Sequence, residues 1–271
     1  MTNPENSGAD HLREEGYAHL PGAIGSQTVK ALRETAEGLA FRSDGVGLTI
    51  GATMSIPGLE KVIFAEPIMT LARGLLGERV SLFPNITLRR NTQTPWHVDD
   101  AFRLPVEGWE DADRVEFLQV TVYLQSNGET GGGLDVVPRS HRLEERAGAA
   151  DSFHAFIATM RADAITVPSD AGDAVLWDGR LMHRSTPSAR PPAPPNYAIH
   201  WTFADEGAGR VRFLDHLLAR GANERDATGV DRRYSEIRAF SFDSVAGDAF
   251  LARAETAGVT LFDAPRADAQ R

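Results

Sequence analysis

Apolar residues in the first third of the chain recur at the three- and four-residue spacing of amphipathic helices. This pattern predicts a short helix that ends at Gly16, a helix from Ser26 to about Ala40, and a helix from Ile68 to Leu76. Ser26 is a favourable N-cap for the second of them. Residues 43–58 hold many glycines and small side chains, so we expect a loop there with one short strand from Gly47 to Ile50. The N-terminal part is therefore predicted to be largely helical.

Most of the remaining apolar residues occur in short runs that are rich in β-branched and aromatic side chains and bounded by turn residues. The predicted strands are Tyr17 to Leu20, Val80 to Arg90, Glu116 to Leu124, Leu134 to Val137, Ala164 to Val167, Ala174 to Trp177 and Tyr197 to Phe203. The polar sequence after them is predicted to be mostly helical. Early helices followed by many short strands favour a single domain over residues 1–271, with a β-sandwich or barrel-like core and helical cover.

Composition limits the functions that this chain can have. The formal net charge of −10 argues against a nucleic-acid partner, which needs a basic surface to meet phosphates. The sequence contains no cysteine, so disulfides, thiolate nucleophiles and cysteine-ligated metal sites are excluded. The sequence has no signal-peptide pattern and no run of about 18 apolar residues. We therefore expect a cytoplasmic protein with no nucleic-acid partner and no membrane partner.

Trp96-His97-Val98-Asp99 is the segment with the clearest chemistry. In an extended backbone, side chains at i and i+2 point to the same face, so His97 and Asp99 can occupy two adjacent positions on one metal ion. Two histidines and one carboxylate with open positions form the ligand set of non-haem Fe(II) oxygenases. Taken alone, however, a His-x-Asp pair is a short motif that arises by chance, and it also fits a hydrogen-bonded surface pair.

A third ligand must come from a later part of the chain. The histidines that follow Asp99 are His141, His154, His183, His200 and His216. His183 is the best placed, because a turn, a short strand and a second turn precede it and would hold the imidazole in position.

Five sequence elements in a fixed order extend this motif. They are Glu15-Gly16-Tyr17 with Leu20-Pro21-Gly22, Leu75-Leu76-Gly77, His97-Val98-Asp99, Asn127-Gly128 with Val137-Pro138-Arg139-Ser140-His141, and Gly172-Asp173 with His183-Arg184-Ser185. From about Leu12 to Phe203 the chain thereby resembles the phytanoyl-CoA dioxygenase-like family of Fe(II)- and 2-oxoglutarate-dependent oxygenases. The resemblance implies a double-stranded β-helix, or jelly roll, whose core covers about residues 80–205. It also implies one Fe(II) held by His97, Asp99 and His183, with 2-oxoglutarate and O2 as co-substrates.

The resemblance further implies an oxidoreductase, most simply a hydroxylase that acts on a small organic molecule in bacterial secondary or catabolic metabolism. Related halogenases have a small residue at the position of Asp99, so a carboxylate there favours oxygen transfer over halogenation. Desaturation, cyclisation and epimerisation start from the same hydrogen abstraction, and the sequence leaves them open, as it does the oligomeric state. Substrate identity is expected to depend on residues 43–58, residues 100–114 and the helical tail.

The residues that would bind 2-oxoglutarate are less evident. The family has an arginine shortly before the last core strand, where it grips the far carboxylate, but here Pro or Asn fills the positions just ahead of Tyr197. Arg190 is the favoured substitute, with Arg89 or Arg90 as alternatives. Gln119 matches a polar position that often contacts 2-oxoglutarate. Two other classes stay open: a jelly-roll metal enzyme that does not use 2-oxoglutarate, and a non-catalytic relative that binds a small ligand.

Overall fold

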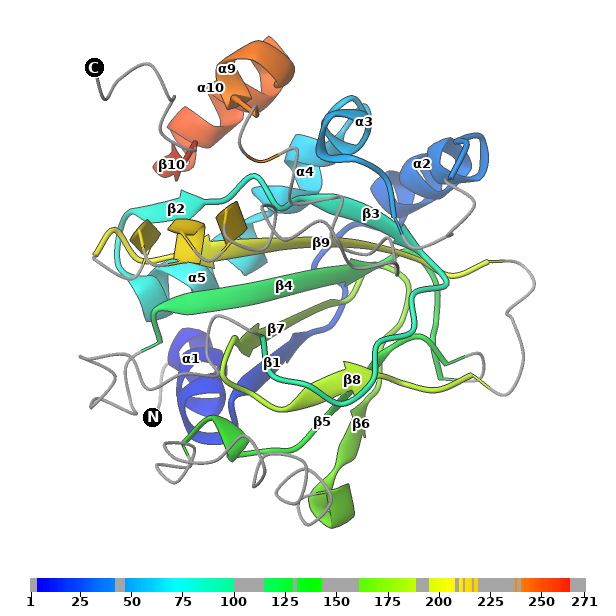
Figure 1. Cartoon of the computed structure of the whole chain (residues 1–271), viewed down its shortest axis with the longest axis vertical. Helices are drawn as coiled ribbons and strands as arrows, with labels where there is room; N and C mark the ends of the chain where they lie inside the picture. The colour runs from blue at the N-terminus through cyan, green and yellow to red at the C-terminus, as the bar shows by residue number, and fades with distance from the viewer. Residues whose placement is uncertain are drawn as a thin grey trace.

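The structure is a computed structural model that describes residues 4–41, 47–99, 115–128, 131–142, 161–188, 195–207 and 240–263, together with 210, 211, 213–215, 217, 218 and 237. Helices gather in the N-terminal part and again near the C-terminal end (Figure 1). They include α1 (Pro4–Glu15), α2 (Ser26–Glu37), α3 (Ile50–Met54), α4 (Leu59–Ile63), α5 (Glu66–Leu76), α9 (Phe242–Val245), α10 (Asp248–Thr256) and the short 3-10 helices η2 (Ser140–Arg142) and η4 (Arg161–Asp163).

The strands form two sheets that face each other (Figure 1). The seven-stranded sheet has the order β1-β7-β4-β9-β2-β10, and β3 also pairs with β9. Its strands are β1 (Tyr17–Leu20), β2 (Val80–Leu82), β3 (Thr87–Arg90), β4 (Phe117–Tyr123), β7 (Ala174–Asp178), β9 (Tyr197–Ala204) and β10 (Val259–Leu261). The three-stranded sheet consists of β5 (Leu134–Val136), β6 (Ile165–Val167) and β8 (His183–Ser185). Helices around a mainly antiparallel jelly-roll core confirm the predicted fold class.

The large sheet separates an apolar side from a polar side because strand side chains alternate between its two faces. Val120 and Val122 on β4 and Ile199 on β9 pack with the helices in the main hydrophobic core. Thr121 on β4 and His200 on β9 point the other way, toward the small sheet. The candidate site therefore lies between the sheets, and the helices support the back of the larger one.

Two of the predicted helices cover the sheet much as their spacing suggested. α2 buries Val29, Leu32 and Ala36, although its N-cap is Gly25 and Ser26 is the first helical residue. α5 begins two residues earlier than predicted and ends at Leu76. None of the helices in the described part of the chain has the length and hydropathy needed to cross a membrane.

Two local predictions were wrong, and one strand in the tail was not predicted. Part of the expected loop at 43–58 is helical, because Thr49 accepts a hydrogen bond from the Ala52 N–H at 3.1 Å and α3 buries Ile50. The single strand predicted from Val80 to Arg90 is divided into β2 and β3. The tail contributes a strand as well as helices, since β10 pairs in parallel with β2 and completes the edge of the large sheet.

Candidate metal centre

Backbone pairing brings the His-x-Asp segment alongside β8. The His97 N–H donates to the His183 carbonyl at 2.9 Å, and the His183 N–H donates to the His97 carbonyl at 2.9 Å. The Asp99 N–H donates to the carbonyl of Gly179 at 3.3 Å, in the turn between β7 and β8. The segment is thus fixed at two points, and its two polar side chains lie on the side that faces the large sheet.

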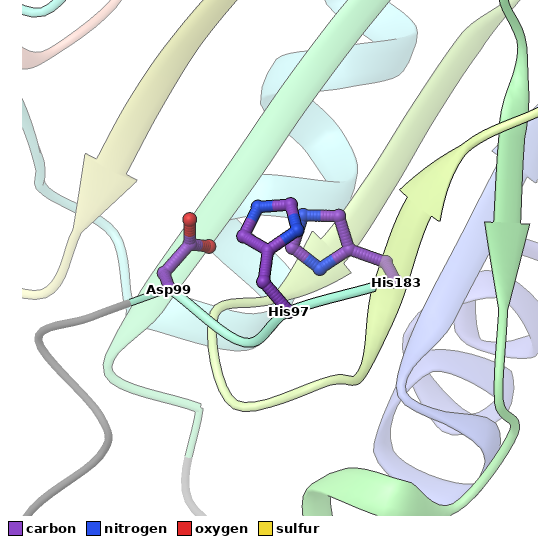
Figure 2. A group of neighbouring side chains, drawn as sticks. All are labelled: His97, Asp99 and His183. Atoms are coloured by element: carbon purple, nitrogen blue, oxygen red, sulfur yellow. The ribbon is translucent and has the colours of Figure 1, made fainter. Parts of the chain in front are cut away.

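His97, Asp99 and His183 converge on one point (Figure 2). Each offers one ligand atom, and these atoms all lie within 4.8 Å of one another. Two imidazole nitrogens and a carboxylate oxygen are donors that Fe(II) and similar divalent ions accept. Among the residues that the structure describes, this is the group of histidine, aspartate and glutamate side chains that fits a metal ion.

Both imidazoles are oriented by their own backbone. Nδ1 of His97 lies 2.8 Å from the carbonyl oxygen of Pro95, and Nδ1 of His183 lies 2.9 Å from that of Leu181. A carbonyl oxygen can only accept, so each Nδ1 carries the proton and each Nε2 keeps its lone pair for a metal. A fixed tautomer of this kind is typical of histidines that bind metals.

The protonation state of His183 also suits coordination. Burial lowers its pKa well below the usual value, and the neighbouring His97 and the positive charge of Arg89 act in the same direction. His183 is therefore neutral at pH 7, and a metal ion does not need to displace a proton from it.

A polar cluster behind the ligands ties their two segments together. The Arg184 guanidinium lies over the Trp96 ring at 4.7 Å, and its Nε donates to the Asp135 carboxylate at 2.8 Å. Asp135 is 4% exposed and also accepts hydrogen bonds from Thr166 and Thr186, each at 2.8 Å. Trp96 precedes His97 and Arg184 follows His183, so this cluster links the two ligand segments on the face opposite the metal ligands.

A cavity of about 280 Å³ lies between the sheets and includes the three ligands in its wall. The Trp177 ring lies 5.1 Å from the His183 ring and 5.6 Å from the His200 ring, as measured between centroids. His200 Nδ1 lies 3.0 Å from Thr121 Oγ1. His200 therefore faces the cavity, and Trp177 is part of the cavity wall beside the metal centre.

Three side-chain amides, Asn91, Gln125 and Asn196, line the cavity where β4 ends. The Asn91 N–H donates to the Asn196 carbonyl at 2.9 Å, and the Asn196 N–H donates to Asn91 Oδ1 at 2.8 Å. Nδ2 of Asn196 donates to the Gly131 carbonyl at 2.8 Å. Asn91 has a φ of 51°, a left-handed conformation that asparagine adopts more readily than most residues. These amides thus hold the backbone as well as line the cavity.

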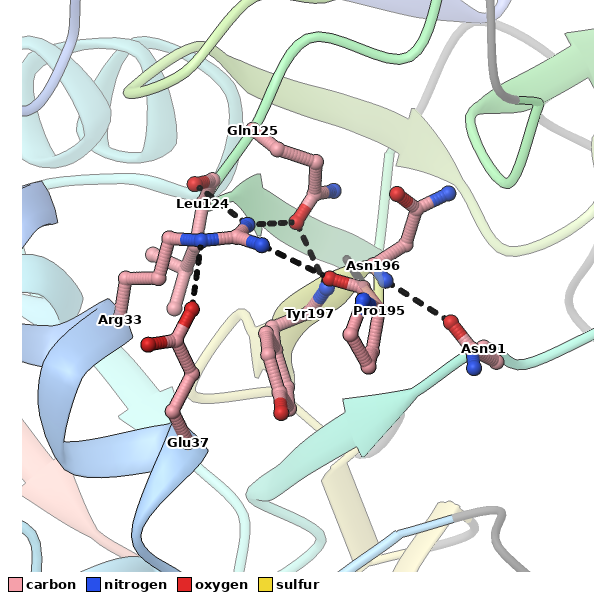
Figure 3. A network of polar contacts seen from close by, with 8 residues as sticks. All are labelled: Arg33, Glu37, Asn91, Leu124, Gln125, Pro195, Asn196 and Tyr197. Atoms are coloured by element: carbon pink, nitrogen blue, oxygen red, sulfur yellow. Dashed lines mark hydrogen bonds and ion pairs between the residues drawn. The ribbon is translucent and has the colours of Figure 1, made fainter. Parts of the chain in front are cut away.

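We call the part of the cavity that Asn91, Gln125 and Asn196 line its amide end. Arg33, on α2, contacts this end from outside the cavity (Figure 3). Its Nη1 donates to the Leu124 carbonyl at 3.3 Å and to Gln125 Oε1 at 3.2 Å, and its Nη2 donates to the Pro195 carbonyl at 3.0 Å. Gln125 Oε1 also accepts from the Tyr197 N–H at 2.6 Å. One guanidinium therefore joins the end of β4 to the start of β9.

The structure describes only one of the two residues predicted to bind 2-oxoglutarate, and both assignments stay predictions. Gln119 points to the inner side of β4, but its Oε1 accepts a hydrogen bond from Thr202 at 2.7 Å, and it is not among the cavity-lining residues. Thr121 and Tyr123, farther along the same strand, line the cavity instead. Arg190 lies outside the described residues, as does the stretch 100–114, so those expectations stay predictions.

Comparisons with known proteins add a family to this geometry. A family model described as phytanoyl-CoA dioxygenase (PhyH) matches residues 12–191 of the chain. The search of curated protein sequences found no match to this chain.

Several solved structures share the fold. SnoN, a non-haem α-ketoglutarate-dependent epimerase from nogalamycin biosynthesis, is 22% identical with a TM-score of 0.55, over 74% of this chain and 83% of that chain. HygX from Streptomyces hygroscopicus, with nickel and 2-oxoglutarate bound, is 14% identical with a TM-score of 0.59, over 76% and 88%. EctD from S. alaskensis with bound Fe is 22% identical with a TM-score of 0.55, over 76% and 79%.

Proposed function

The chain belongs to the phytanoyl-CoA dioxygenase family, and we propose that it is an Fe(II)- and 2-oxoglutarate-dependent oxygenase that hydroxylates a small organic molecule. O2 is the second co-substrate in this proposal. The nogalamycin pathway of the similar structure SnoN supports a place in bacterial secondary metabolism, and a catabolic role is the alternative.

The proposal depends above all on the convergence of His97, Asp99 and His183 within 4.8 Å. These three residues would hold the metal on one side and leave the other coordination positions open for exchangeable ligands. When bound, Fe(II) with 2-oxoglutarate and O2 supplies the oxidising chemistry, and the protein supplies orientation and exclusion of water.

The residues that the structure describes account for the contribution of the protein, which is orientation and exclusion of water. His97 and His183 present Nε2 in a fixed direction because their Nδ1 atoms are bound to backbone carbonyls. His183 is 4% exposed and Trp177 is 3% exposed, so this wall of the cavity keeps water away from the ligand. The cavity volume of about 280 Å³ suits a small molecule rather than a polymer.

An anaerobic titration of the metal-free protein, first with Fe(II) and then with 2-oxoglutarate, tests the proposal. We expect a visible metal-to-ligand charge-transfer band that saturates at one equivalent of each. Fe(II) binding without that band would favour a jelly-roll metal enzyme that does not use 2-oxoglutarate. Absence of stoichiometric Fe(II) binding would favour a non-catalytic relative that binds a small ligand.

A further inference from the structure

We infer that Arg89, on β3, binds the far carboxylate of 2-oxoglutarate in this protein. The inference rests on the proposed function and deepens it by naming a residue. It departs from the family pattern, which places the corresponding arginine after the last metal-binding histidine, and from Arg190, which the sequence favoured.

The strand registers place Arg89 in a row that faces the cavity. On neighbouring strands, Arg89 of β3 pairs with Ala198 of β9, and Ala198 pairs with Tyr123 of β4. Paired residues point to the same face of a sheet, and all three line the cavity. The middle residue is an alanine, so a short side chain lies between Arg89 and Tyr123 in this row.

The two neighbours of Arg89 on β3 point away from the cavity. Leu88 packs in the main hydrophobic core behind the sheet. The Arg90 guanidinium lies 4.5 Å from the centre of the Phe41 ring, also on the far side. Among the described residues that line the cavity, Arg89 is the only arginine or lysine.

The positive charge of Arg89 acts on Tyr123, the cavity-lining residue at the other end of this row. At Tyr123, burial raises the pKa well above its usual value, and Arg89 acts in the opposite direction as the next largest influence. Tyr123 thus stays a neutral phenol that can donate a hydrogen bond to a carboxylate held by Arg89.

The small sheet forms the opposite wall of the cavity, and Ser185 lies there at a distance from His183 that suits a short dicarboxylate. Ser185 lies two residues after His183 on β8, so it points to the same side about 7 Å farther along the strand. It lines the cavity, and its Oγ lies 2.9 Å from Thr94 Oγ1. A five-carbon dicarboxylate bound beside His183 would extend along this direction toward Ser185, Tyr123 and Arg89.

The start of β9, where the family has its arginine, is used differently here (Figure 3). The Pro195 carbonyl accepts from Arg33, and the backbone of Asn196 pairs with Asn91. Nδ2 of Asn196 donates to Gly131. Arg33 is committed to backbone carbonyls and Gln125 and does not line the cavity, so it does not replace the missing arginine.

A pair of adjacent variants tests the inference, because Arg89 and Arg90 differ in the face to which they point. The wild type, Arg89→Met, Arg90→Met and Arg190→Met are saturated anaerobically with Fe(II). Each is then titrated with 2-oxoglutarate and with 2-oxobutyrate, which keeps the chelating group and lacks the far carboxylate. The charge-transfer band reports binding of either compound, without turnover.

We expect Arg89→Met to weaken 2-oxoglutarate binding by about 10- to 100-fold, the range for a lost charge-assisted hydrogen bond, and to leave 2-oxobutyrate binding unchanged. Arg90→Met and Arg190→Met should bind both compounds like the wild type. Arg89→Lys keeps the charge but loses the two-pronged geometry, so an intermediate affinity is expected, and it replaces the methionine variant if that one does not fold.

Unchanged 2-oxoglutarate affinity in Arg89→Met, or a loss in Arg190→Met alone, would overturn the inference and leave the proposed function intact. A wild type that binds Fe(II) but gives no band with either compound would overturn both. Equal weakening of 2-oxoglutarate and 2-oxobutyrate in Arg89→Met would place the effect at the chelating end and also contradict the inference.

Discussion

The two ends of the cavity are held in place in different ways. At the metal end, each histidine is oriented by a carbonyl two residues earlier, and His97 and His183 are joined by reciprocal backbone hydrogen bonds. At the amide end, Arg33 on α2 holds the Gln125 side chain and the Pro195 carbonyl, and the Asn91 side chain accepts a hydrogen bond from the Asn196 N–H, so residues from distant parts of the chain fix this end.

This difference has a functional meaning. A metal ion requires its ligands at nearly fixed distances, and short backbone hydrogen bonds between the His97 segment and β8 provide such precision. The amide end has no such requirement from a metal, and its geometry depends on how a helix is placed against the sheet. Changes at the metal end should therefore alter metal affinity, whereas changes at the amide end should alter the stability of the fold first.

The largest expected effect is that of Asp99→Ala at the metal end. Removing one of three ligands should weaken Fe(II) or Co(II) binding by more than about 100-fold, beyond the range for residues that only support a ligand. Isothermal titration with Co(II) measures this, and thermal unfolding of the metal-free protein checks the fold. Asp163→Ala, at an exposed aspartate, should bind metal like the wild type. Wild-type affinity in Asp99→Ala would mean that the ligand is misassigned.

The next largest effect concerns the cluster behind the ligands. Asp135→Asn removes the charge that holds Arg184 over Trp96, so we expect metal affinity to fall by about 10-fold. Asp173→Asn is the matched control, because Asp173 is also buried and accepts hydrogen bonds from His19, Gly22 and Asp170, which lie in segments that carry no metal ligand.

Both aspartate variants should lower the melting temperature of the metal-free protein, since each disturbs a buried carboxylate. Only Asp135→Asn should also reduce the further rise in melting temperature that saturating Co(II) produces. An equal reduction in both variants would show that the cluster stabilises the fold without setting the spacing of His97 and His183.

At the amide end, Arg33→Met should leave the metal affinity of the folded protein unchanged and reduce its stability. The variant leaves the carbonyls of Leu124 and Pro195 without their donor, which costs about 1–3 kcal/mol of unfolding free energy. Urea unfolding measures this value. Lys30→Met is the control on the same helix, because Lys30 is 78% exposed and should change stability by less than about 0.5 kcal/mol. A loss of metal affinity in Arg33→Met would remove the distinction between the two ends.

The same difference explains what could be predicted from the sequence. His97 and Asp99 are close in sequence, and the turn and strand ahead of His183 are local signals, so the metal site was recognisable from short motifs. Arg33 contacts residues 91 to 162 positions away, and no local pattern marks it. Arg89 and Arg90 could not be separated, because the direction of each side chain depends on the pairing of β3 with β9.

The secondary structure shows the same difference between local signals and long-range contacts. The strand at Phe117–Tyr123 was predicted to within one residue at each end, because a continuous stretch of aromatic, aliphatic and β-branched residues is a local signal. β10 was missed, because the three residues Val259–Leu261 are too few to show a period and are a strand only through their pairing with β2. α3 was missed because five residues rich in glycine and alanine resemble a loop until Thr49 is seen to cap them.

The smallest predicted effect is a pH dependence that belongs to the metal end alone. Burial lowers the pKa of His183 in the folded state below its unfolded value of about 6.5. Above pH 6.5 His183 is neutral in both states and does not change the unfolding free energy. Below pH 6.5 His183 binds a proton in the unfolded chain but stays neutral in the folded chain. The unfolding free energy of the metal-free protein should thus fall by up to about 1.4 kcal/mol per pH unit below pH 6.5.

His183→Gln should make this slope shallower, leaving the part due to His141, whose pKa burial also lowers. Arg33→Met should keep the full slope, because the arginine and amides of that end do not titrate in this range; an unchanged slope in His183→Gln would show that His183 does not stay neutral in the folded protein.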